Sequence, residues 1–201
     1  MRTLLLSGVV MTLGLLPATA GAQTNDEKLE ISAFAINMGT IGTGANAMVD
    51  IKIDRWSTAQ EREQLITTML EKGSKALLAE LQKAPVKGRF RIPGKQGPDP
   101  YQLGLGHDLR YAWQSPLPEG GQRIVIATDR YIGFQEARNN SRTMDYPFTF
   151  IEIRVNKDGE GEGKMAVATK ISFDKKTKTI ELENYSSEPV RLNALKVKVK
   201  S

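Results

Sequence analysis

Short stretches in which apolar and polar residues alternate are the feature that most constrains the fold of this chain. In AMVDIKIDRW, residues 47–56, Val49, Ile51 and Ile53 alternate with polar residues, which is typical of a strand with one face in solvent. Further strand-like stretches are residues 29–38, 107–114, 122–129, 146–155, 163–173, 179–185 and 190–199. Several short strands with close turns predict a mainly β (α+β) fold, an antiparallel β-sandwich or open barrel.

One segment follows a helical period instead. Leucine, isoleucine and methionine residues recur at helical spacing between residues 65 and 81. Ser57 and Thr58 each precede a Gln or Glu by three residues, the spacing of a capping box. Gly73 interrupts the period, so the pattern predicts one helical segment or a helical hairpin near residues 58–84.

The N-terminus has the pattern of a cleaved export signal. Arg2 precedes an apolar run from Leu4 to Leu16, and Ala20-Gly21-Ala22 fits a cleavage site. The apolar run is shorter than the roughly 20 residues that cross a bilayer. We therefore expect residues 1–22 to be removed and residues 23–201 to form a single β-rich domain, periplasmic or extracellular, that does not span the membrane.

The chain has no cysteine and a single histidine, His107. An exported domain without disulfides depends on its core for stability. The same composition excludes a thiol nucleophile, a cysteine zinc site and a multi-histidine metal centre. No cofactor is expected, and no nucleic-acid-binding or Walker motif is present.

The basic residues are concentrated near the C-terminus. From Lys164 to Ser201 the net charge is about +5, whereas the rest of the expected mature chain is near −1. Such a segment could face an anionic lipid or polysaccharide. The interpretation that the sequence favours is that these lysines protect exposed strand edges from pairing with other chains.

The stretch FQEARNNSRTMDYPF, residues 134–148, is the leading site candidate. Arg138 and Arg142 could clamp an anionic ligand, or they could pair with Glu136 and Asp145 and pin the loop to the sheet. We expect a non-enzymatic domain that binds a small ligand or a cell-envelope component near this loop and the Gly/Pro-rich loop at 86–106. The residues expected at that site are Glu136, Arg138, Arg142, Asp145, Tyr146, Tyr111 and Trp113.

Two other functions remain open from the sequence. A hydrolase of envelope or extracellular polymers would need at least two carboxylates in one cleft, within reach of His107 or a shared water. Its candidate acids are Asp99, Asp108, Asp129, Glu136 and Asp145. A purely structural envelope protein would have a filled interior, and a ligand binder an apolar cavity rimmed by aromatic residues.

Residues 156–163, NKDGEGEG, carry four oxygen-bearing side chains that could suit calcium. They lack the spacing of an EF-hand, so the pattern favours a hairpin turn at Asp158-Gly159 and no metal.

Three stretches resemble a group of exported bacterial proteins of unassigned function. The first runs from GGQRIVIATDR through FQEARNNSRTMDYPFTFIEIRV, the second is DGEGEGKMAVATK, and the third is KTKTIELENYSSEPVRLNALK. The resemblance covers roughly residues 120–195, and more weakly residues 29–84, including MVDIKIDRWST. It implies a shared domain behind a cleaved signal, and it brings no catalytic residue, cofactor or substrate.

Overall fold

Ten strands and one interrupted helix make up the described part of the chain. The computed structural model describes residues 27–37, 46–93, 106–130, 132, 148–167, 171–174, 179–182 and 190–200. The elements are β1 (Lys28–Asn37), β2 (Asn46–Ile53), α1 (Ala59–Lys83), β3 (Gly88–Arg91), β4 (His107–Pro116), β5 (Gln122–Thr128), β6 (Thr149–Val155), β7 (Glu160–Val167), β8 (Ile171–Asp174), β9 (Thr179–Leu182) and β10 (Val190–Lys200). The mainly β fold with one helical region is confirmed.

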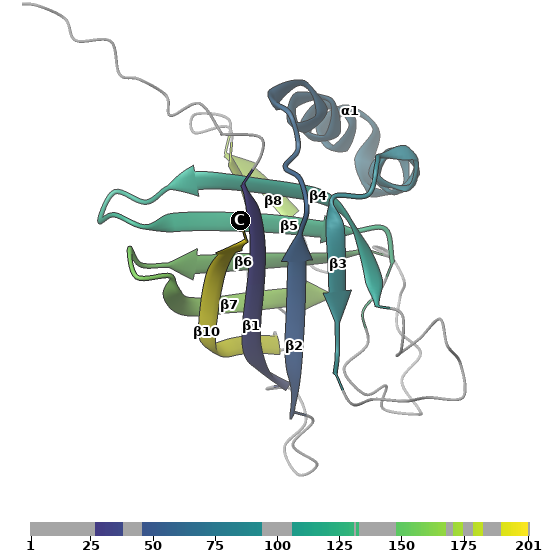
Figure 1. The fold of residues 1–201 in the computed structure, drawn as a ribbon. Helices are drawn as coiled ribbons and strands as arrows, with labels where there is room; N and C mark the ends of the chain where they lie inside the picture. The colour runs from purple at the N-terminus through teal and green to yellow at the C-terminus, as the bar shows by residue number, and fades with distance from the viewer. Residues whose placement is uncertain are drawn as a thin grey trace, which may run out of the picture.

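Eight of the strands form a closed antiparallel barrel in the order β1-β10-β7-β6-β5-β4-β3-β2. β1 closes it, because β1 pairs with β2 on one side and with the C-terminal β10 on the other. β10, β1, β2 and β3 run crosswise in front of β4 to β7 (Figure 1), so the barrel consists of two four-stranded layers. The expected sandwich or open barrel is therefore corrected to a closed barrel.

Two bulges shape the strands that link the layers. In β4, Leu109 and Ala112 both belong to the barrel core although two residues separate them. In β10, Leu192 and Leu195 also both belong to the core although two residues separate them, and Ala194 between them has a φ of 49°. An extra residue at a bulge bends its strand, which lets β10 follow the edge of both layers.

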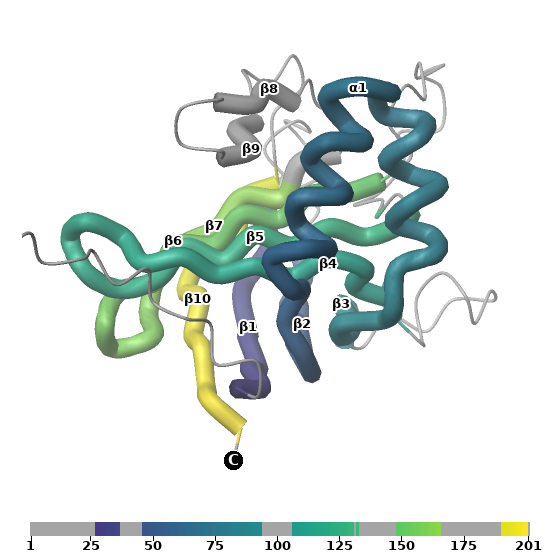
Figure 2. Tube along the Cα trace, turned by 90° about the horizontal axis from the view of Figure 1, so that it is seen from above, coloured from purple at the N-terminus to yellow at the C-terminus, as the bar shows by residue number. Residues whose placement is uncertain are grey.

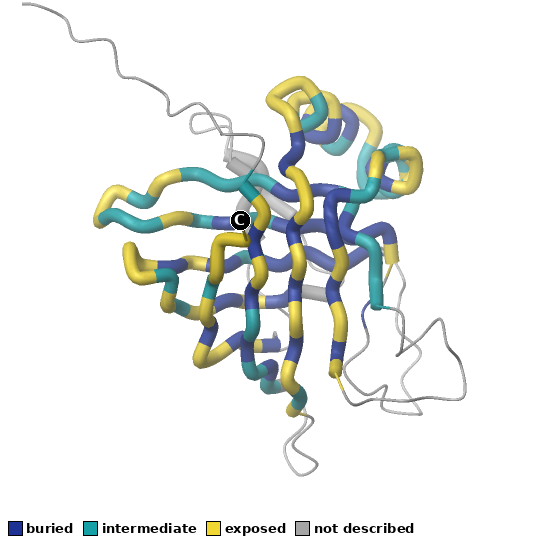
Figure 3. The backbone as a smooth tube through the Cα atoms, in the orientation of Figure 1, coloured by how far each residue is buried: buried dark blue, intermediate teal, exposed yellow. Residues whose placement is uncertain are grey.

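The barrel interior is filled with side chains. Exposed and buried residues alternate along β1, β2 and β3 (Figure 3), and the buried set points inward. Inward residues that are fully buried include Ile31, Ile51, Phe90, Ile124 and Ile153. This core of branched aliphatic residues supplies the stability that disulfides cannot supply in a chain without cysteine.

The helical region is a hairpin. Gly73 has a φ of 77° and a ψ of −173°, which ends the first arm and reverses the chain. The Gln64 amide donates a 3.0 Å hydrogen bond to the Glu80 carboxylate, although a straight helix would separate these residues by about 24 Å. The two arms lie side by side in Figure 2. The capping box at Thr58 is also confirmed, because Thr58 and Glu61 exchange the two hydrogen bonds.

A second apolar cluster joins the hairpin to the barrel. Leu65, Leu77 and Leu81 of α1 pack with side chains on the outer faces of β4, β5 and β6. The other residues of this cluster are Tyr111 of β4, Ala127 of β5, Phe150 of β6, and Phe148 just before β6. The outer faces of β4, β5 and β6 are thus partly covered by the hairpin. The outer face of the β10-β1-β2-β3 layer points away from the hairpin (Figures 1 and 2).

We expect Gly73→Ala to lower the free energy of unfolding by about 1–3 kcal/mol, because side-chain-bearing residues disfavour this backbone conformation. No atom lies within 4 Å of the added Cβ position, so the effect isolates backbone strain. Urea unfolding measures it. Lys75→Ala, an exposed substitution in the neighbouring turn of the helix, should change stability little, and equal effects of the two variants would contradict the explanation.

The structure changes one local prediction and agrees with another. The single strand expected at residues 163–173 is two strands, β7 and β8, and β8 pairs with β9 in a separate two-stranded sheet. In the turn at 156–159, the Asn156 side chain accepts hydrogen bonds from the backbone N–H of Asp158 and Glu160. Asn156 therefore closes a hairpin, as the favoured interpretation expected.

No helix among the described residues is long and apolar enough to cross a membrane.

Candidate functional site

The strand ends that bracket the two loop candidates lie side by side at one end of the barrel. Strand pairing places Phe90 opposite His107, Leu109 opposite Thr128, and Ala127 opposite Phe150. Residues 94–105 and 133–147, which connect to these strand ends in the sequence, lie outside the described residues. Those segments contain Asp99, Glu136, Arg138, Arg142, Asp145 and Tyr146, so these expected site residues lie outside the described residues.

His107 covers the core at this end. Its ring lies 6.3 Å from that of Phe90, centroid to centroid, and both side chains are on the inner face of their strands. Burial lowers the pKa of His107 from its usual value, and the nearby Arg130 lowers it further. Asp129 and Asp108 act in the opposite direction without reversing the shift. The imidazole is therefore mainly neutral at pH 7.

Arg110 organises the carboxylates on the outer face. The β4 bulge turns Arg110 outward beside Tyr111, where its Nε donates to Asp129 at 2.9 Å. A second guanidinium nitrogen donates to the Ala84 carbonyl at 3.0 Å, and a third lies 3.7 Å from Asp108. Arg110 thereby ties the end of the hairpin to β4 and β5.

This geometry does not assemble an acid–base pair from the described candidates. His107 and Asp108 are consecutive in β4, so strand alternation places them on opposite faces. Asp129 is committed to Arg110, and Asp108 also lies 3.5 Å from Arg89. Among the described residues, no group of three acidic or histidine side chains is placed to hold a metal ion.

Tyr111 and Trp113 lie away from this end, on the outer face of β4 beside the hairpin. Tyr111 is buried in the second apolar cluster, and this burial raises the pKa of its hydroxyl. Trp113 is half-buried, with the Arg62 guanidinium 5.0 Å above its ring. Both aromatic residues thus help to hold the hairpin on the barrel.

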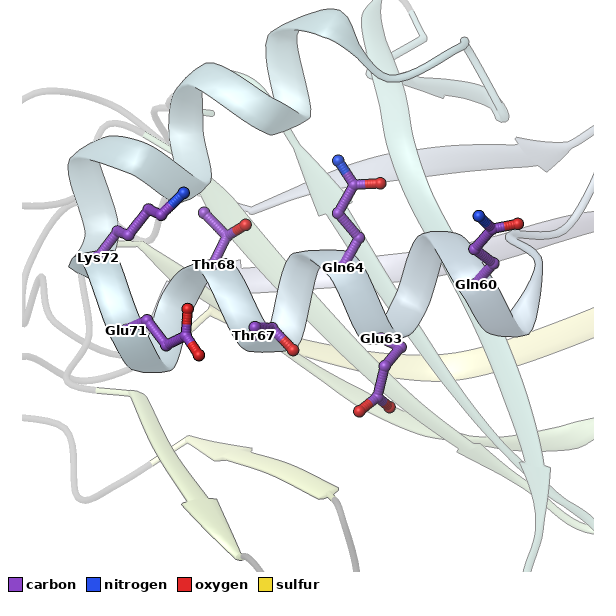
Figure 4. A pocket seen from close by; sticks show the side chains of 7 residues that line it. All are labelled: Gln60, Glu63, Gln64, Thr67, Thr68, Glu71 and Lys72. Carbon is purple, nitrogen blue, oxygen red and sulfur yellow. The ribbon is translucent and has the colours of Figure 1, made fainter.

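Two open hollows in the described part of the chain lie on the hairpin. The first, about 320 Å³, is lined by polar side chains from the first arm of α1 (Figure 4). The second, about 220 Å³, lies between the two arms and β4, and Glu61, Glu80, Lys83 and Arg110 line part of it. Neither is the apolar cavity rimmed by aromatic residues that a small-ligand site would have.

A buried ion pair lies beside the second hollow. Lys87 follows the hairpin and is only 4% exposed, and its Nζ donates to both carboxylate oxygens of Glu61 at 2.7 and 2.8 Å. Glu61 also accepts from the Thr58 backbone N–H, and these hydrogen bonds lower its pKa in spite of partial burial. The sequence offered no sign of this pair, because Lys87 reads as an ordinary loop residue.

The outer face of the β10-β1-β2-β3 layer carries a surplus of exposed basic side chains. We call it the basic face. Eight exposed basic side chains point outward from it, against two exposed acids, Glu30 and Asp50. The basic residues are Lys28, Lys52, Arg89, Arg91, Arg191, Lys196, Lys198 and Lys200.

Half of these cations have a carboxylate partner. Lys200 pairs with Glu30 at 2.8 Å, and the pair lowers the pKa of Glu30. The other pairs are Lys52 with Asp54, Arg89 with Asp108 and Lys196 with Glu160, at 2.7, 3.5 and 3.9 Å. Within the described ranges, no carboxylate forms an ion pair with Lys28, Arg91, Arg191 or Lys198. These four are the cations of the basic face for which the described carboxylates supply no ion-pair partner.

Sequence reasoning identified part of this face and missed the rest. The basic C-terminal segment contains four of the eight cations, Arg191, Lys196, Lys198 and Lys200. The remaining four come from β1, β2 and β3 and join them only through strand pairing. Period-two alternation predicts on which face of its strand each residue lies. It does not predict which strands are neighbours in the sheet.

No family model, curated protein or solved structure matches this chain.

Proposed function

We propose that this protein is an exported, non-enzymatic binding domain that docks on an anionic component of the cell envelope through its basic face. The observation that carries the proposal is a set of four cations that form no ion pair with a described carboxylate, on a sheet face that no described element covers: Lys28, Arg91, Arg191 and Lys198. The export signal expected at residues 1–22 supports an envelope destination.

Strand pairing weakens the alternative explanation for these charges. From Val190 to Lys196, β10 pairs with β7 on one side and β1 on the other. Arg191 and Lys196 therefore do not protect an open edge, and only the end of β10 around Lys198 and Lys200 retains that role. A charged sheet face, in contrast to an edge, offers area for a partner.

The other functions have less support from the described residues. A small-ligand site inside the barrel would compete with the filled core. A hydrolase that combined His107 with Asp108 or Asp129 would have to use groups on opposite faces of the sheet. A purely structural role gives no reason for a cluster of cations that pair with no described carboxylate.

We expect the double variant Arg191→Glu/Lys198→Glu to bind anionic polymer at least about 30-fold more weakly than the unaltered protein. Each basic residue near an anionic surface contributes about 1 kcal/mol, and two of them about 2 kcal/mol before the added repulsion. Titration of dextran sulfate and of phosphatidylglycerol vesicles at low salt measures the loss. The protein is purified after export, and its intact mass shows whether residues 1–22 have been removed.

A matched variant separates the site from net charge. Lys72→Glu/Lys75→Glu makes the same charge change at exposed positions on the hairpin. This variant should keep most of the affinity, and binding by the unaltered protein should weaken steeply as salt is raised. If both variants lose affinity equally, or if the unaltered protein binds neither probe, the proposal is wrong.

A further inference from the structure

The basic face also carries an apolar patch at one end. Phe34 and Met48 are directly opposite each other on β1 and β2, and Ile36 is the next outward residue along β1. Met48 is 49% exposed, which makes it one of three large apolar side chains with high exposure in the described part of the chain. We call Phe34, Ile36 and Met48 the apolar patch.

Two arginines that form no ion pair with a described carboxylate lie near this patch. Arg191 of β10 is directly opposite Ile36, and Asn193 is opposite Phe34. On the other side, Arg91 of β3 is opposite Asp50, the outward residue that follows Met48 along β2. Arg191 therefore lies directly beside the apolar patch, and Arg91 lies one residue pair further along the sheet, next to Asp50.

This combination discriminates between anionic partners. A polyanion in solution is attracted to the arginines, but it offers little apolar surface against which Met48 and Ile36 could be buried. A bilayer offers both, because headgroups accept the cations while the boundary of the acyl chains accepts apolar side chains. Electrostatic attraction and apolar burial then add at one surface.

We propose that the occupant of the basic face is the surface of an anionic lipid bilayer, with the apolar patch inserted among the lipids and Arg91 and Arg191 on their phosphates. This inference rests on the proposed function and specifies its partner. Insertion into a bilayer also requires that the hairpin does not cover the basic face. The hairpin α1 packs on the opposite layer (Figures 1 and 2), so it leaves this face accessible.

The test uses the exported protein and three probes: vesicles of phosphatidylcholine with one quarter phosphatidylglycerol, vesicles of phosphatidylcholine alone, and dextran sulfate. Sedimentation with the vesicles and titration with the polymer give the affinities. We expect binding to the anionic vesicles and little binding to neutral ones. Phe34→Ser/Met48→Ser should weaken vesicle binding about tenfold and leave dextran sulfate binding unchanged, because only the bilayer accepts apolar side chains.

Leu70→Ser is the matched control, because Leu70 on the hairpin is also 49% exposed. It should leave vesicle binding unchanged. Met48→Ser alone, at an exposed strand position, provides a milder variant if the double variant unfolds, and thermal unfolding reports which variants are folded. We expect a smaller loss of vesicle binding from Met48→Ser, in the same direction.

The outcomes separate the inference from the proposed function. Vesicle binding that does not respond to Phe34→Ser/Met48→Ser or Met48→Ser, with tight dextran sulfate binding, overturns the bilayer as partner and leaves an anionic polysaccharide. An absence of binding to either anionic probe overturns both. Equal binding to neutral and anionic vesicles would also overturn the inference, since the arginines would then contribute nothing.

Discussion

Phe90→Ala is expected to lower the free energy of unfolding by about 3–5 kcal/mol, the usual range for removing a buried aromatic ring. Phe90 is fully buried in β3, and its ring lies under His107 at the end of the barrel. β3 is only four residues long, so the strand has few other core contacts to hold it between β2 and β4. Urea unfolding followed by circular dichroism measures the change.

His107 provides a second and independent measurement of the same cavity. Because burial is the main cause of its lowered pKa, removal of the Phe90 ring should let water reach the imidazole and raise the pKa toward its ordinary value. His107 is the single histidine, so its proton resonances titrate without overlap. Phe34→Ala, on the outer face of β1, should alter neither quantity appreciably, and a Phe90 variant as stable as this control would contradict the filled barrel.

Most strands were predictable because they obey period two over several residues. The hairpin of α1 was predictable for a similar reason, since Gly73 falls between two arms with helical spacing. Closure of the barrel was not, because it depends on pairing between β1 and β10, whose paired residues Lys28 and Lys200 are far apart in the sequence. Local periodicity carries no information on such a pairing.

Because of the bulges, strict alternation does not correctly predict which face each residue of β4 occupies. Strict alternation along β4 would place Arg110 and Tyr111 on opposite faces, but the bulge turns both outward. Arg110 then meets Asp129 and Tyr111 meets the hairpin. A core residue, two outward residues and another core residue, as in LRYA at 109–112 and LNAL at 192–195, is the local trace of both bulges.

The basic face illustrates the same limit for function. The surplus of charge near the C-terminus was visible in the sequence, but its interpretation depended on whether β10 lies at an edge. Pairing of Val190 to Lys196 on both sides changes that interpretation and brings Arg91 of β3 into the same face. The charge count was therefore sufficient to suggest a partner, and only the topology could locate its surface.

Glu61→Gln is expected to lower the free energy of unfolding by about 3 kcal/mol, because it leaves the ammonium of Lys87 buried without its counter-ion. This is the lower end of the range for breaking a buried pair, since the Glu61 side chain keeps about a third of its exposure at 32%. Glutamine can still accept from the Thr58 N–H, so the capping box is retained and the change reports the charge alone. Urea unfolding at pH 7 measures it.

The second substitution Lys87→Met should recover most of this loss. In Glu61→Gln/Lys87→Met no buried ammonium remains, and the aliphatic side chain fills a similar volume, so stability should return to within about 1 kcal/mol of the unaltered protein. Single variants Glu61→Gln and Lys87→Met complete the double-mutant cycle. Losses that simply add in the double variant would show that the two side chains are not coupled.

The pair also predicts a dependence of stability on pH. The pKa of Glu61 is lowered in the folded protein, so its ionised carboxylate contributes stability above the ordinary pKa of about 4.5, and this contribution is lost as the pH falls through the folded-state value. Glu61→Gln removes this contribution, so the difference in stability between the two proteins should shrink as the medium is acidified from pH 7 toward pH 3. A difference that stays constant over that range would mean that the ion pair does not anchor the hairpin to the barrel.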